Sequence, residues 1–336
     1  MNAFEGRTIL LTGGTGSFGQ HFIRTALARW SPAAIRVFSR DELKQSVMER
    51  QIDDDRLRFL LGDVRDRDRL RRAVDGVDIV IHAAALKQVP ACEYNPFEAV
   101  RTNILGAQNV AEVCIDAGVR RAVALSTDKA VSPTNLYGAT KLCAERLFVQ
   151  SNVYAGARET RLSCVRYGNV VGSRGSVLPL FTEQAASGEL TVTDERMTRF
   201  WITLDQAVQF VADSVARMQG GELFIPKIPS MRVLDLAEAV APGARIRYTG
   251  IRPGEKLHEA LLTPEEARHT VDAGSCYIVE PEHPFWGDGR IPDATPVAED
   301  FLYTSDRNTD WLDVAALREL LTATSGTVEP AAVEVG

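Results

Sequence analysis

The chain of 336 residues is long enough to bury a large core, and its composition, 45% hydrophobic and 25% charged, is that of a globular protein. Its 45 acidic and 38 basic residues give a net charge of -7, which argues against a nucleic-acid-binding protein, since such proteins usually carry a basic face. Five scattered cysteines form no zinc-type group, so we expect free thiols and no metal. Without a signal peptide pattern or a membrane-length apolar run, we expect a cytoplasmic protein.

The first half of the chain alternates short apolar runs with helical patterns. The apolar runs are TILLTG, IRVFS, LRFLLGDV, VDIVIHAAA, RAVALST and LSCVRYGNV. Continuous apolar strands are typical of a sheet that is covered on both faces. The pattern therefore predicts an α/β fold of Rossmann type, a doubly wound parallel sheet with helices on both faces. Residues 96–118 are predicted to form one long helix closed by a glycine.

Beyond about residue 172 the alternation loosens. Helical patterns are separated by short strand candidates and by loops rich in glycine and proline. We expect residues 1–171 to form a cofactor-binding domain, and residues 172–324 to form a smaller α/β substrate domain that is partly interleaved with the first. The tail, residues 325–336, offers little to pack and is expected to be disordered.

A glycine-rich turn follows the first predicted strand directly. Its sequence, TGGTGSFGQHF, spaces three glycines three residues apart, and a helical pattern begins behind it. Such glycines permit a tight turn, close approach of the backbone to a pyrophosphate and close packing of helix on strand, while the helix N-terminus attracts the anion. The sequence therefore predicts a dinucleotide site formed by Gly13, Thr15, Gly16, Ser17, Phe18 and Gly19.

The end of the second predicted strand bears on which cofactor is bound. Sites specific for NAD usually carry an acid about 20 residues after the glycine loop, where it binds the ribose 2′-hydroxyl. This chain has Ser39, followed by Arg40 and, one helical turn later, Lys44. A small hydroxyl group beside two cations suits a 2′-phosphate, so we expect NADP in preference to NAD. The alternative is that Arg40 and Lys44 form solvated pairs with Asp41 and Glu42.

The ends of the next two strands complete the predicted cofactor site. Asp63 and Val64 follow the third strand, where they are placed to meet the adenine. The fourth strand ends in Ala83, Ala84 and Ala85, whose small side chains leave room for the middle of the cofactor. We expect both groups to contact the bound dinucleotide.

One stretch, STDKAVSPTNLYGATK at residues 126–141, concentrates acid–base groups. Tyr137 and Lys141 are four residues apart, so on a helix their side chains share a face. An ammonium group beside a phenol favours the phenolate and lowers its pKa, which makes Tyr137 a candidate base near neutral pH. Thr127 can hydrogen-bond the same substrate oxygen. Asp128 and Lys129 follow at once and form a second candidate acid–base pair.

The glycine loop together with YGATK resembles the extended short-chain dehydrogenase/reductase superfamily, whose members hold NAD(P) and act on nucleotide sugars. The resemblance implies that Tyr137 is the catalytic base, that Lys141 also binds the nicotinamide ribose and that Thr127 is their hydroxyl partner. Tyr137 and Lys141 are therefore expected to contact the cofactor as well. It further implies that Asn103, in the long helix, supports Lys141 through water.

Further motifs are similar to one group within this superfamily. HAAALKQVP, RYGNVVGSRGSV, MTRFW and RPGEKLHE, with the short gap between Thr127 and Tyr137, resemble the soluble, configuration-inverting UDP-N-acetylglucosamine 4,6-dehydratases. The resemblance implies oxidation at C4, loss of water across C5–C6 and return of hydride to C6. In that chemistry Lys129 is the candidate C5 base, which needs a lowered pKa, and Asp128 is the candidate acid, which needs a raised one. The division of these roles stays open.

The same resemblance implies a UDP-sugar as the substrate. An acidic protein must hold a diphosphate with placed donors, and a guanidinium group gives bidentate phosphate contacts. The expected substrate-binding residues are Lys87, Asn169, Arg174, Met197, Arg199, Arg252 and Glu255, the last of them through the uridine ribose. Lys87 could instead lie on the surface, Arg174 and Arg199 could form structural ion pairs, and Met197 could belong to the core.

Two rival functions use the same scaffold. A nucleotide-sugar C4 epimerase or 4-ketoreductase would not need Asp128 and Lys129. A non-catalytic NADPH-sensing regulator would usually have lost Tyr137 or Lys141, and both are present. The expected partners are UDP-N-acetylglucosamine and further copies of the chain, as a dimer or hexamer with residues 96–118 and 137–153 at the seam. We expect no nucleic acid and no membrane among the partners.

Overall fold

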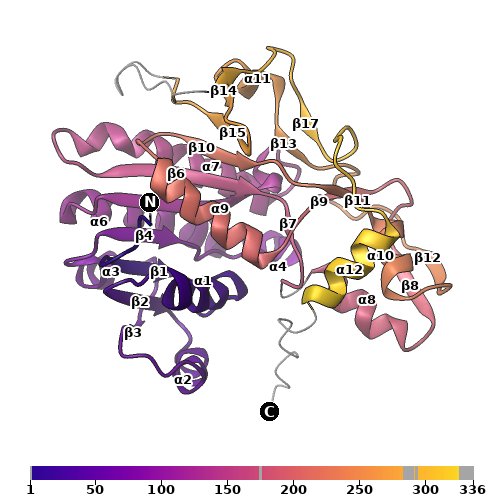
Figure 1. The fold of residues 1–336 in the computed structure, drawn as a ribbon, viewed down its shortest axis with the longest axis horizontal. Helices are drawn as coiled ribbons and strands as arrows, with labels where there is room; N and C mark the ends of the chain where they lie inside the picture. The colour runs from indigo at the N-terminus through magenta and orange to yellow at the C-terminus, as the bar shows by residue number, and fades with distance from the viewer. Residues whose placement is uncertain (1, 174–175, 283–290, 292–293, 325–336) are drawn as a thin grey trace.

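The fold is built around a ten-stranded sheet, shown in Figure 1. This computed structural model describes residues 2–173, 176–282, 291 and 294–324. Seven neighbouring strands run parallel in the order β10-β6-β5-β4-β1-β2-β3, and the antiparallel strands β15, β14 and β16 extend the β10 edge. The strand order reverses between β1 and β4, where doubly wound sheets form their ligand crevice. The predicted α/β fold is confirmed.

The strands of this sheet coincide with the apolar runs of the sequence. All four residues of β4 and of β10 are buried, as expected for strands covered on both faces. The strands are β1 (Thr8–Thr12), β2 (Ala34–Ser39), β3 (Leu57–Leu61), β4 (Ile79–His82), β5 (Arg121–Thr127), β6 (Arg161–Tyr167), β10 (Leu223–Pro226), β14 (Thr270–Asp272), β15 (Cys276–Val279) and β16 (Thr295–Pro296).

Helices cover both faces of the sheet (Figure 1). On one face α1 and α9 pack against each other, and on the other face α3 contacts α6, which contacts α7. These helices are α1 (Ser17–Arg29), α2 (Glu42–Gln51), α3 (Arg67–Val74), α6 (Gly106–Ala117), α7 (Leu136–Gln150) and α9 (Leu204–Arg217). Several begin at a side-chain cap that accepts a backbone N–H, namely Asp41, Asp66, Asn135 and Thr203.

The predicted long helix over residues 96–118 consists of three continuous parts. These are α5 (Pro96–Ala99), a π-helical turn η1 (Val100–Leu105) and α6, preceded by the short helix α4 (Val89–Tyr94). Gly118 ends α6 with φ 70°, the left-handed conformation that glycine adopts without strain. The helix and its glycine stop are confirmed, whereas the π-helical turn was not predicted.

A second region has its own small core at one end of the molecule. It contains α8 (Val177–Ala185), α10 (Val233–Val240) and α12 (Val314–Thr324), the strand pair β8 (Glu189–Val192) and β12 (Arg245–Tyr248), and the three-stranded sheet of β7 (Asn169–Val170), β9 (Thr198–Ile202) and β11 (Ser230–Arg232). Between these segments α9 and β10 return to the main sheet. The boundary at residue 171 stays a prediction, and the tail over residues 325–336 lies outside the described residues.

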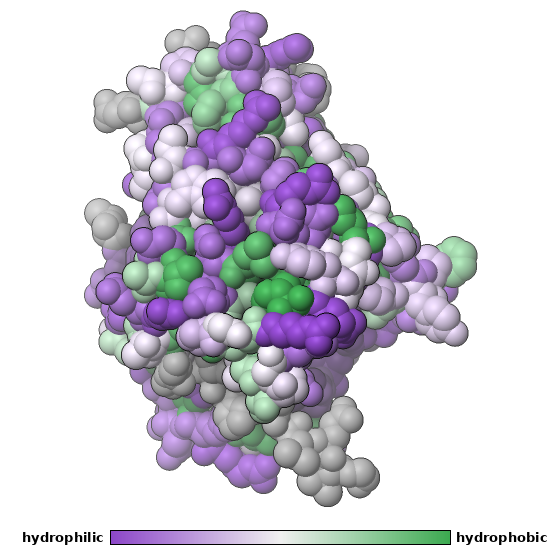
Figure 2. Space-filling model, turned by 90° about the vertical axis from the view of Figure 1, so that its right-hand side faces the viewer, coloured by the Kyte–Doolittle hydropathy of each residue, from purple (hydrophilic) through white to green (hydrophobic). Residues whose placement is uncertain are grey.

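The surface of this second region is shown in Figure 2, where apolar side chains form small patches interrupted by hydrophilic ones. Its exposed large apolar residues include Tyr248, Ile251 and Trp311. Within the part of the chain that the structure describes, no helix has both the length and the apolar character to cross a membrane.

Candidate active site

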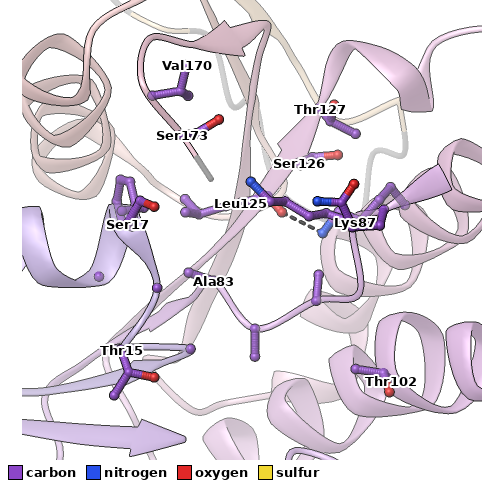
Figure 3. A pocket seen from close by; sticks show the side chains of 18 of the residues that line it. Thr15, Ser17, Ala83, Lys87, Thr102, Leu125, Ser126, Thr127, Val170 and Ser173 are labelled. Atoms are coloured by element: carbon purple, nitrogen blue, oxygen red, sulfur yellow. Dashed lines mark hydrogen bonds between the residues drawn. The ribbon is translucent and has the colours of Figure 1, made fainter. Parts of the chain in front are cut away.

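A cavity of about 560 Å³ opens at the carboxyl ends of the parallel strands. In Figure 3, Thr15 and Ser17 lie on one side of it, and Lys87, Ser126 and Thr127 lie on the opposite side. All of the predicted cofactor-binding residues line this cavity: Gly13, Thr15, Gly16, Ser17, Phe18, Gly19, Ser39, Arg40, Lys44, Asp63, Val64, Ala83, Ala84, Ala85, Tyr137 and Lys141. The remaining catalytic candidates, Thr127, Asp128 and Lys129, line it too.

The glycine loop has the geometry that its sequence predicts. Gly13 has φ 68°, and a Cβ added there would lie 2.8 Å from the backbone nitrogen of Ala84, so only glycine lets the ends of β1 and β4 approach this closely. A Cβ at Gly19 would lie 2.3 Å from the Gly14 carbonyl oxygen, which explains how α1 packs onto the loop. The N-terminus of α1 thus meets the cavity at a loop whose glycines leave the backbone exposed, an arrangement suited to a pyrophosphate.

Ser39 ends β2, Arg40 follows it, and Lys44 lies in the first turn of α2; each of the three side chains has a partner inside the protein. The Ser39 hydroxyl accepts a hydrogen bond from Gln45 Nε2 at 2.9 Å. Arg40 lies 3.5 Å from Asp63, and Lys44 lies 2.7 Å from Asp41, while both cationic side chains remain 53% exposed. The surface pair expected between Lys44 and Asp41 is therefore present, yet both cations still line the cavity.

Asn103 lies in the π-helical turn and connects three elements. Its Oδ1 accepts a hydrogen bond from Leu86 N at 2.8 Å, and its Nδ2 donates to Leu86 O and to Thr140 Oγ1, each at 2.9 Å. Thr140 precedes Lys141 in α7, and Leu86 precedes Lys87 in the loop after β4. Asn103 therefore fixes that loop to the catalytic helix by direct bonds, and its water-mediated support of Lys141 stays a prediction.

Thr127, Asp128 and Lys129 form a compact hydrogen-bonded group where β5 ends. Thr127 Oγ1 donates to Asp128 Oδ1 at 2.8 Å, and Lys129 Nζ donates to the same oxygen at 3.1 Å. Asp128 is 1% exposed, and its second oxygen is buried without a protein partner. The short helix η2 (Asp128–Ala130) turns the chain here, because Lys129 N donates to Thr127 Oγ1. The site thus holds a buried carboxylate within reach of an amine.

Tyr137 and Lys141 lie on the same helix but differ from expectation in their electrostatics. Burial raises the pKa of Tyr137 to about 12, against the opposing effects of Lys129 and of a hydrogen bond to Thr127. Lys141 Nζ donates to Leu125 O at 2.6 Å, and burial lowers the pKa of Lys141. The prediction that Lys141 lowers the pKa of Tyr137 is therefore wrong for this structure, in which Lys129 is the amine with that effect.

Lys129 differs from expectation in the same way. Burial lowers its pKa, but the carboxylates of Asp128 and Glu259 outweigh burial and raise that pKa above the ordinary lysine value. The prediction of a lowered pKa is wrong here, because the charge of Asp128, whose Oδ1 lies 3.1 Å from Lys129 Nζ, and that of Glu259, whose Oε1 lies 3.4 Å away, both favour the ammonium form. Lys129 is accordingly an ammonium group over the whole neutral range.

The predicted substrate-binding residues divide into two groups. Lys87 and Asn169 line the cavity, whereas Met197, Arg199, Arg252 and Glu255 do not, and Arg174 lies outside the described residues. Met197 is 2% exposed within the second core, and Arg199 donates to its sulfur, to Thr198 O and to Leu257 O. The burial of Met197 agrees with the alternative that it belongs to the core, and Arg199 Nε lies 3.9 Å from Glu259 Oε1, which agrees with the alternative of a structural ion pair.

The loop that carries Arg252 and Glu255 is attached beside the catalytic helix. Gly254 O accepts hydrogen bonds from Thr134 Oγ1 at 3.0 Å and from Asn135 Nδ2 at 2.8 Å, directly before α7. Arg252 itself is exposed, and its backbone N–H donates to Glu255 Oε2 at 3.2 Å. The loop therefore lies near the Tyr137 end of the cavity, although its own side chains do not line it.

Fold and site together define a class of protein. A glycine loop between β1 and α1, a Tyr-x-x-x-Lys pair at the start of α7 and a threonine at the end of β5 surround one cavity. This constellation on a parallel doubly wound sheet is that of the extended short-chain dehydrogenases/reductases, and the predicted resemblance is confirmed.

Comparison with known proteins narrows the class. The family described as polysaccharide biosynthesis protein matches residues 9–281, and the chain belongs to this family. The UDP-N-acetylglucosamine 4,6-dehydratase (inverting) of Campylobacter jejuni is 47% identical over 96% of this chain and 99% of its own length. The UDP-glucose 4-epimerase of Rickettsia canadensis is 42% identical over 82% of this chain and 83% of its own. The X-ray structure of Pen from Bacillus thuringiensis, 38% identical, superimposes with a TM-score of 0.89 over 96% of this chain and 99% of that one.

Proposed function

We propose that the protein is a configuration-inverting UDP-N-acetylglucosamine 4,6-dehydratase, a hydro-lyase that forms UDP-2-acetamido-2,6-dideoxy-β-L-arabino-hex-4-ulose. The observation that carries the proposal is the presence of two acid–base groups in one cavity: Thr127, Tyr137 and Lys141 for redox chemistry, and Asp128 with Lys129 for elimination. The near full-length likeness to the Campylobacter jejuni dehydratase supports the same substrate and outcome.

The first group serves C4 of the sugar. Tyr137 takes the proton of the C4 hydroxyl, and Thr127 hydrogen-bonds the same oxygen. An oxidised nicotinamide, when bound, would accept the hydride from C4 and later return it to C6. Burial raises the pKa of Tyr137 to about 12, so the phenol needs positive charge nearby to lose its proton at neutral pH. Lys129 supplies such a charge, because it lowers the pKa of Tyr137.

The second group serves C5 and C6. The C4 ketone acidifies the C5–H, one group removes this proton, and another protonates the C6 hydroxyl so that it leaves as water. Because Lys129 is held as an ammonium group by two carboxylates, it is suited to donate a proton before it accepts one. Asp128, with one oxygen buried and unpartnered, is its partner in the exchange. The assignment of acid and base to these two residues stays open.

NADP is the cofactor that we propose. The cavity suits a dinucleotide, because Gly13 leaves space at the loop where α1 directs its N-terminus. At the end of β2 the chain carries Ser39 where NAD-specific sites usually carry an acid, and Arg40 and Lys44 offer half-exposed positive charge for a 2′-phosphate. Asp41, which also lines the cavity, is engaged by Lys44.

The UDP group is assigned to the remaining polar residues. We propose that Lys87 and Asn169 contact it from within the cavity, and that Arg252 and Glu255 close on it from the loop attached to α7. Met197, Arg174 and Arg199 stay predicted contacts. Since nucleotide sugars and NADP are cytoplasmic metabolites, we place the enzyme in the cytoplasm.

A homo-oligomer, dimer or hexamer, is the assembly that we propose. Two large aromatic side chains at the outer helices support it, because Tyr94 of α4 and Phe97 of α5 are 89% and 78% exposed. Phe97 lies in the first turn of the long helix that is expected to form the seam, and Tyr94 ends the short helix before it. Exposed aromatic residues of this kind are typical of surfaces that another chain covers.

A second candidate function is a C4 epimerase, favoured by the likeness to the Rickettsia canadensis epimerase. One experiment separates both from a regulator. The purified protein is incubated with UDP-N-acetylglucosamine and NADP+ in heavy water and followed by NMR. The dehydratase must produce a 6-methyl signal and deuterium at C5. A product that keeps its C6 hydroxymethyl group would indicate the epimerase, and unchanged substrate would favour the regulator.

Lys129→Ala tests the elimination group directly. We expect the variant to lose 6-methyl product formation, by about 100-fold or more, because general acid–base groups contribute roughly 10²–10⁴-fold. Binding of NADP+ and UDP, measured by calorimetry, should stay nearly unchanged, because the other cavity residues remain. Normal turnover by this variant would remove Lys129 from the mechanism.

A further inference from the structure

Glu259 is a buried carboxylate at the edge of the acid–base group, in the segment that precedes β13 (Ala260–Leu262). Its backbone is fixed from both sides, because Glu259 N donates to Ser305 Oγ at 2.9 Å and Ser305 N donates to Glu259 O at 2.8 Å. The strand β17 (Tyr303–Thr304) pairs with β13 and supports this arrangement. The Glu259 side chain is 4% exposed, and its Oε2 is buried without a hydrogen-bond partner.

Three cations surround this carboxylate. Lys129 Nζ lies 3.4 Å from Oε1, Arg199 Nε lies 3.9 Å from Oε1, and Lys256 Nζ lies 3.8 Å from Oε2. Lys256 also donates a hydrogen bond to Val131 O, directly after η2. A buried carboxylate is stable only when paired, and here the pairing cations come from η2, from β9 and from the loop that precedes β13.

The groups that face Lys129 come from four parts of the chain. Asp128 lies beside it in η2, Tyr137 faces it from α7, and Arg199 from β9; Glu259 and the cation Lys256 face it from the segment before β13. The ammonium group is therefore paired with two carboxylates, at 3.1 Å from Asp128 and 3.4 Å from Glu259, while its side chain is still 27% exposed and lines the cavity. Lys129 can therefore contact a molecule bound in the cavity while it is paired with both carboxylates.

We propose that Glu259 is a positioning residue for the elimination step, which holds the Lys129 ammonium group against Asp128 and sets the pH at which Lys129 exchanges its proton. The proposal rests on the proposed dehydratase function. It gives the C-terminal half of the chain a part in the acid–base chemistry, because β13 and its neighbours place Glu259 against η2.

The direction of the effect follows from the charges. The carboxylates of Asp128 and Glu259 favour the protonated form of Lys129, whereas burial and Arg199 favour the neutral amine. Glu259→Gln keeps the shape of the side chain and removes one of the two negative charges. Lys129 should then lose its proton at a lower pH, by about 1 to 3 pH units, which is the range for an opposite charge within 4–6 Å.

The test compares the pH dependence of kcat/KM for 6-methyl product formation in the wild type, Glu259→Gln and Glu259→Asp. The part of the pH profile in which kcat/KM changes with the protonation of Lys129 is its Lys129 limb. This limb should move to lower pH in Glu259→Gln, whether Lys129 acts as acid or as base. In Glu259→Asp, which keeps the negative charge, the limb should lie at least partly back toward its wild-type pH. Glu222→Gln is the matched control, because Glu222 is also buried but binds Ser163, Gln219 and Gly220 instead of a cation. In Glu222→Gln the Lys129 limb of the pH profile should stay at its wild-type pH.

A second readout does not depend on turnover. The side-chain nitrogen of Lys129 is titrated by NMR in protein labelled with ¹⁵N-lysine, with its signal assigned through Lys129→Arg. The midpoint should fall in Glu259→Gln and not in Glu222→Gln. A slower Glu259→Gln enzyme with an unmoved limb and an unmoved midpoint would overturn the proposal. If the wild type forms no 6-methyl product, the proposed function fails, while this titration still decides whether Glu259 controls Lys129.

Discussion

Gly138 of α7 packs directly on the backbone of the elimination group. A Cβ added at Gly138 would lie 2.1 Å from the carbonyl oxygen of Lys129 and 3.1 Å from Pro133 Cβ. Real Cβ atoms do not approach other heavy atoms within 3.0 Å, so Gly138→Ala must displace the Lys129 carbonyl or α7 by about 0.9 Å, the difference between 3.0 and 2.1 Å. The substitution therefore moves Lys129 relative to Tyr137, the residue that precedes Gly138.

Two opposing terms set the stability of Gly138→Ala. Alanine favours a helix over glycine by about 0.5–1 kcal/mol, and overpacking a tight contact costs about 1–3 kcal/mol. The net loss should therefore be no more than about 2.5 kcal/mol. Catalysis is more sensitive, because a misplacement of about 1 Å can cost about 100-fold in rate. We expect kcat to fall about 100-fold in a protein that remains folded.

The assay pairs turnover with unfolding. The formation of 6-methyl product gives kcat, and urea unfolding gives the change in the free energy of unfolding. Ala139→Gly, at the exposed neighbouring position, is the control, because it alters helix propensity without touching η2. Turnover by Gly138→Ala within a factor of about two of the wild type would show that the close contact does not position Lys129.

Three further changes test other parts of the account. Arg40→Ala should weaken NADP+ binding about 10- to 100-fold and NAD+ binding little, because one charge-assisted contact to the 2′-phosphate is lost; calorimetry would contradict this if both cofactors weakened alike. Phe97→Asp should lower the molar mass in analytical ultracentrifugation, and an unchanged mass would place the seam elsewhere. Arg166→Leu should cost about 3–5 kcal/mol at pH 7, since it leaves Glu145 and Glu266 buried without their cation. Burial raises the pKa of Glu266, but Arg166 outweighs burial and holds that pKa below its ordinary value of 4.5. The ion pair therefore stabilises the native protein above about that pH, and its contribution is lost as the pH falls below it. The loss of unfolding free energy in Arg166→Leu, measured with urea, should shrink from pH 7 to pH 4, and a constant loss would contradict the pairing.

Much of the fold follows from local sequence patterns. Continuous apolar runs predict buried parallel strands, and the glycine loop predicts the turn that joins β1 to α1, because both depend on residues close together in the chain. The same holds for Thr127, Asp128 and Lys129, which lie at the carboxyl end of β5 and therefore reach the crevice of the sheet. These features could be predicted without knowledge of distant contacts.

Features that depend on distant contacts could not be predicted. The run LSCVRYGNV gives no sign that Asn169 and Val170 leave the main sheet to pair with β9. Glu259 lies in a quoted motif, RPGEKLHE, yet its contact with Lys129 spans 130 residues of sequence, and its carboxylate adds to that of Asp128 in raising the pKa of Lys129. One signal in the sequence could have identified Glu259: it directly precedes the apolar residues 260–262. An acid next to a buried apolar run is expected to be buried as well, and a buried carboxylate needs a cation.

In the proposed reaction one sugar is oxidised at C4, dehydrated across C5–C6 and reduced at C6 in a single cavity. UDP-N-acetylglucosamine carrying deuterium at C4 tests it most directly, with NMR and mass analysis of the product formed in ordinary water. The deuterium should appear in the 6-methyl group of the product, because the hydride taken from C4 returns to C6. Deuterium found again at C4 would indicate an epimerase, and its loss to the solvent would contradict the internal transfer of hydride.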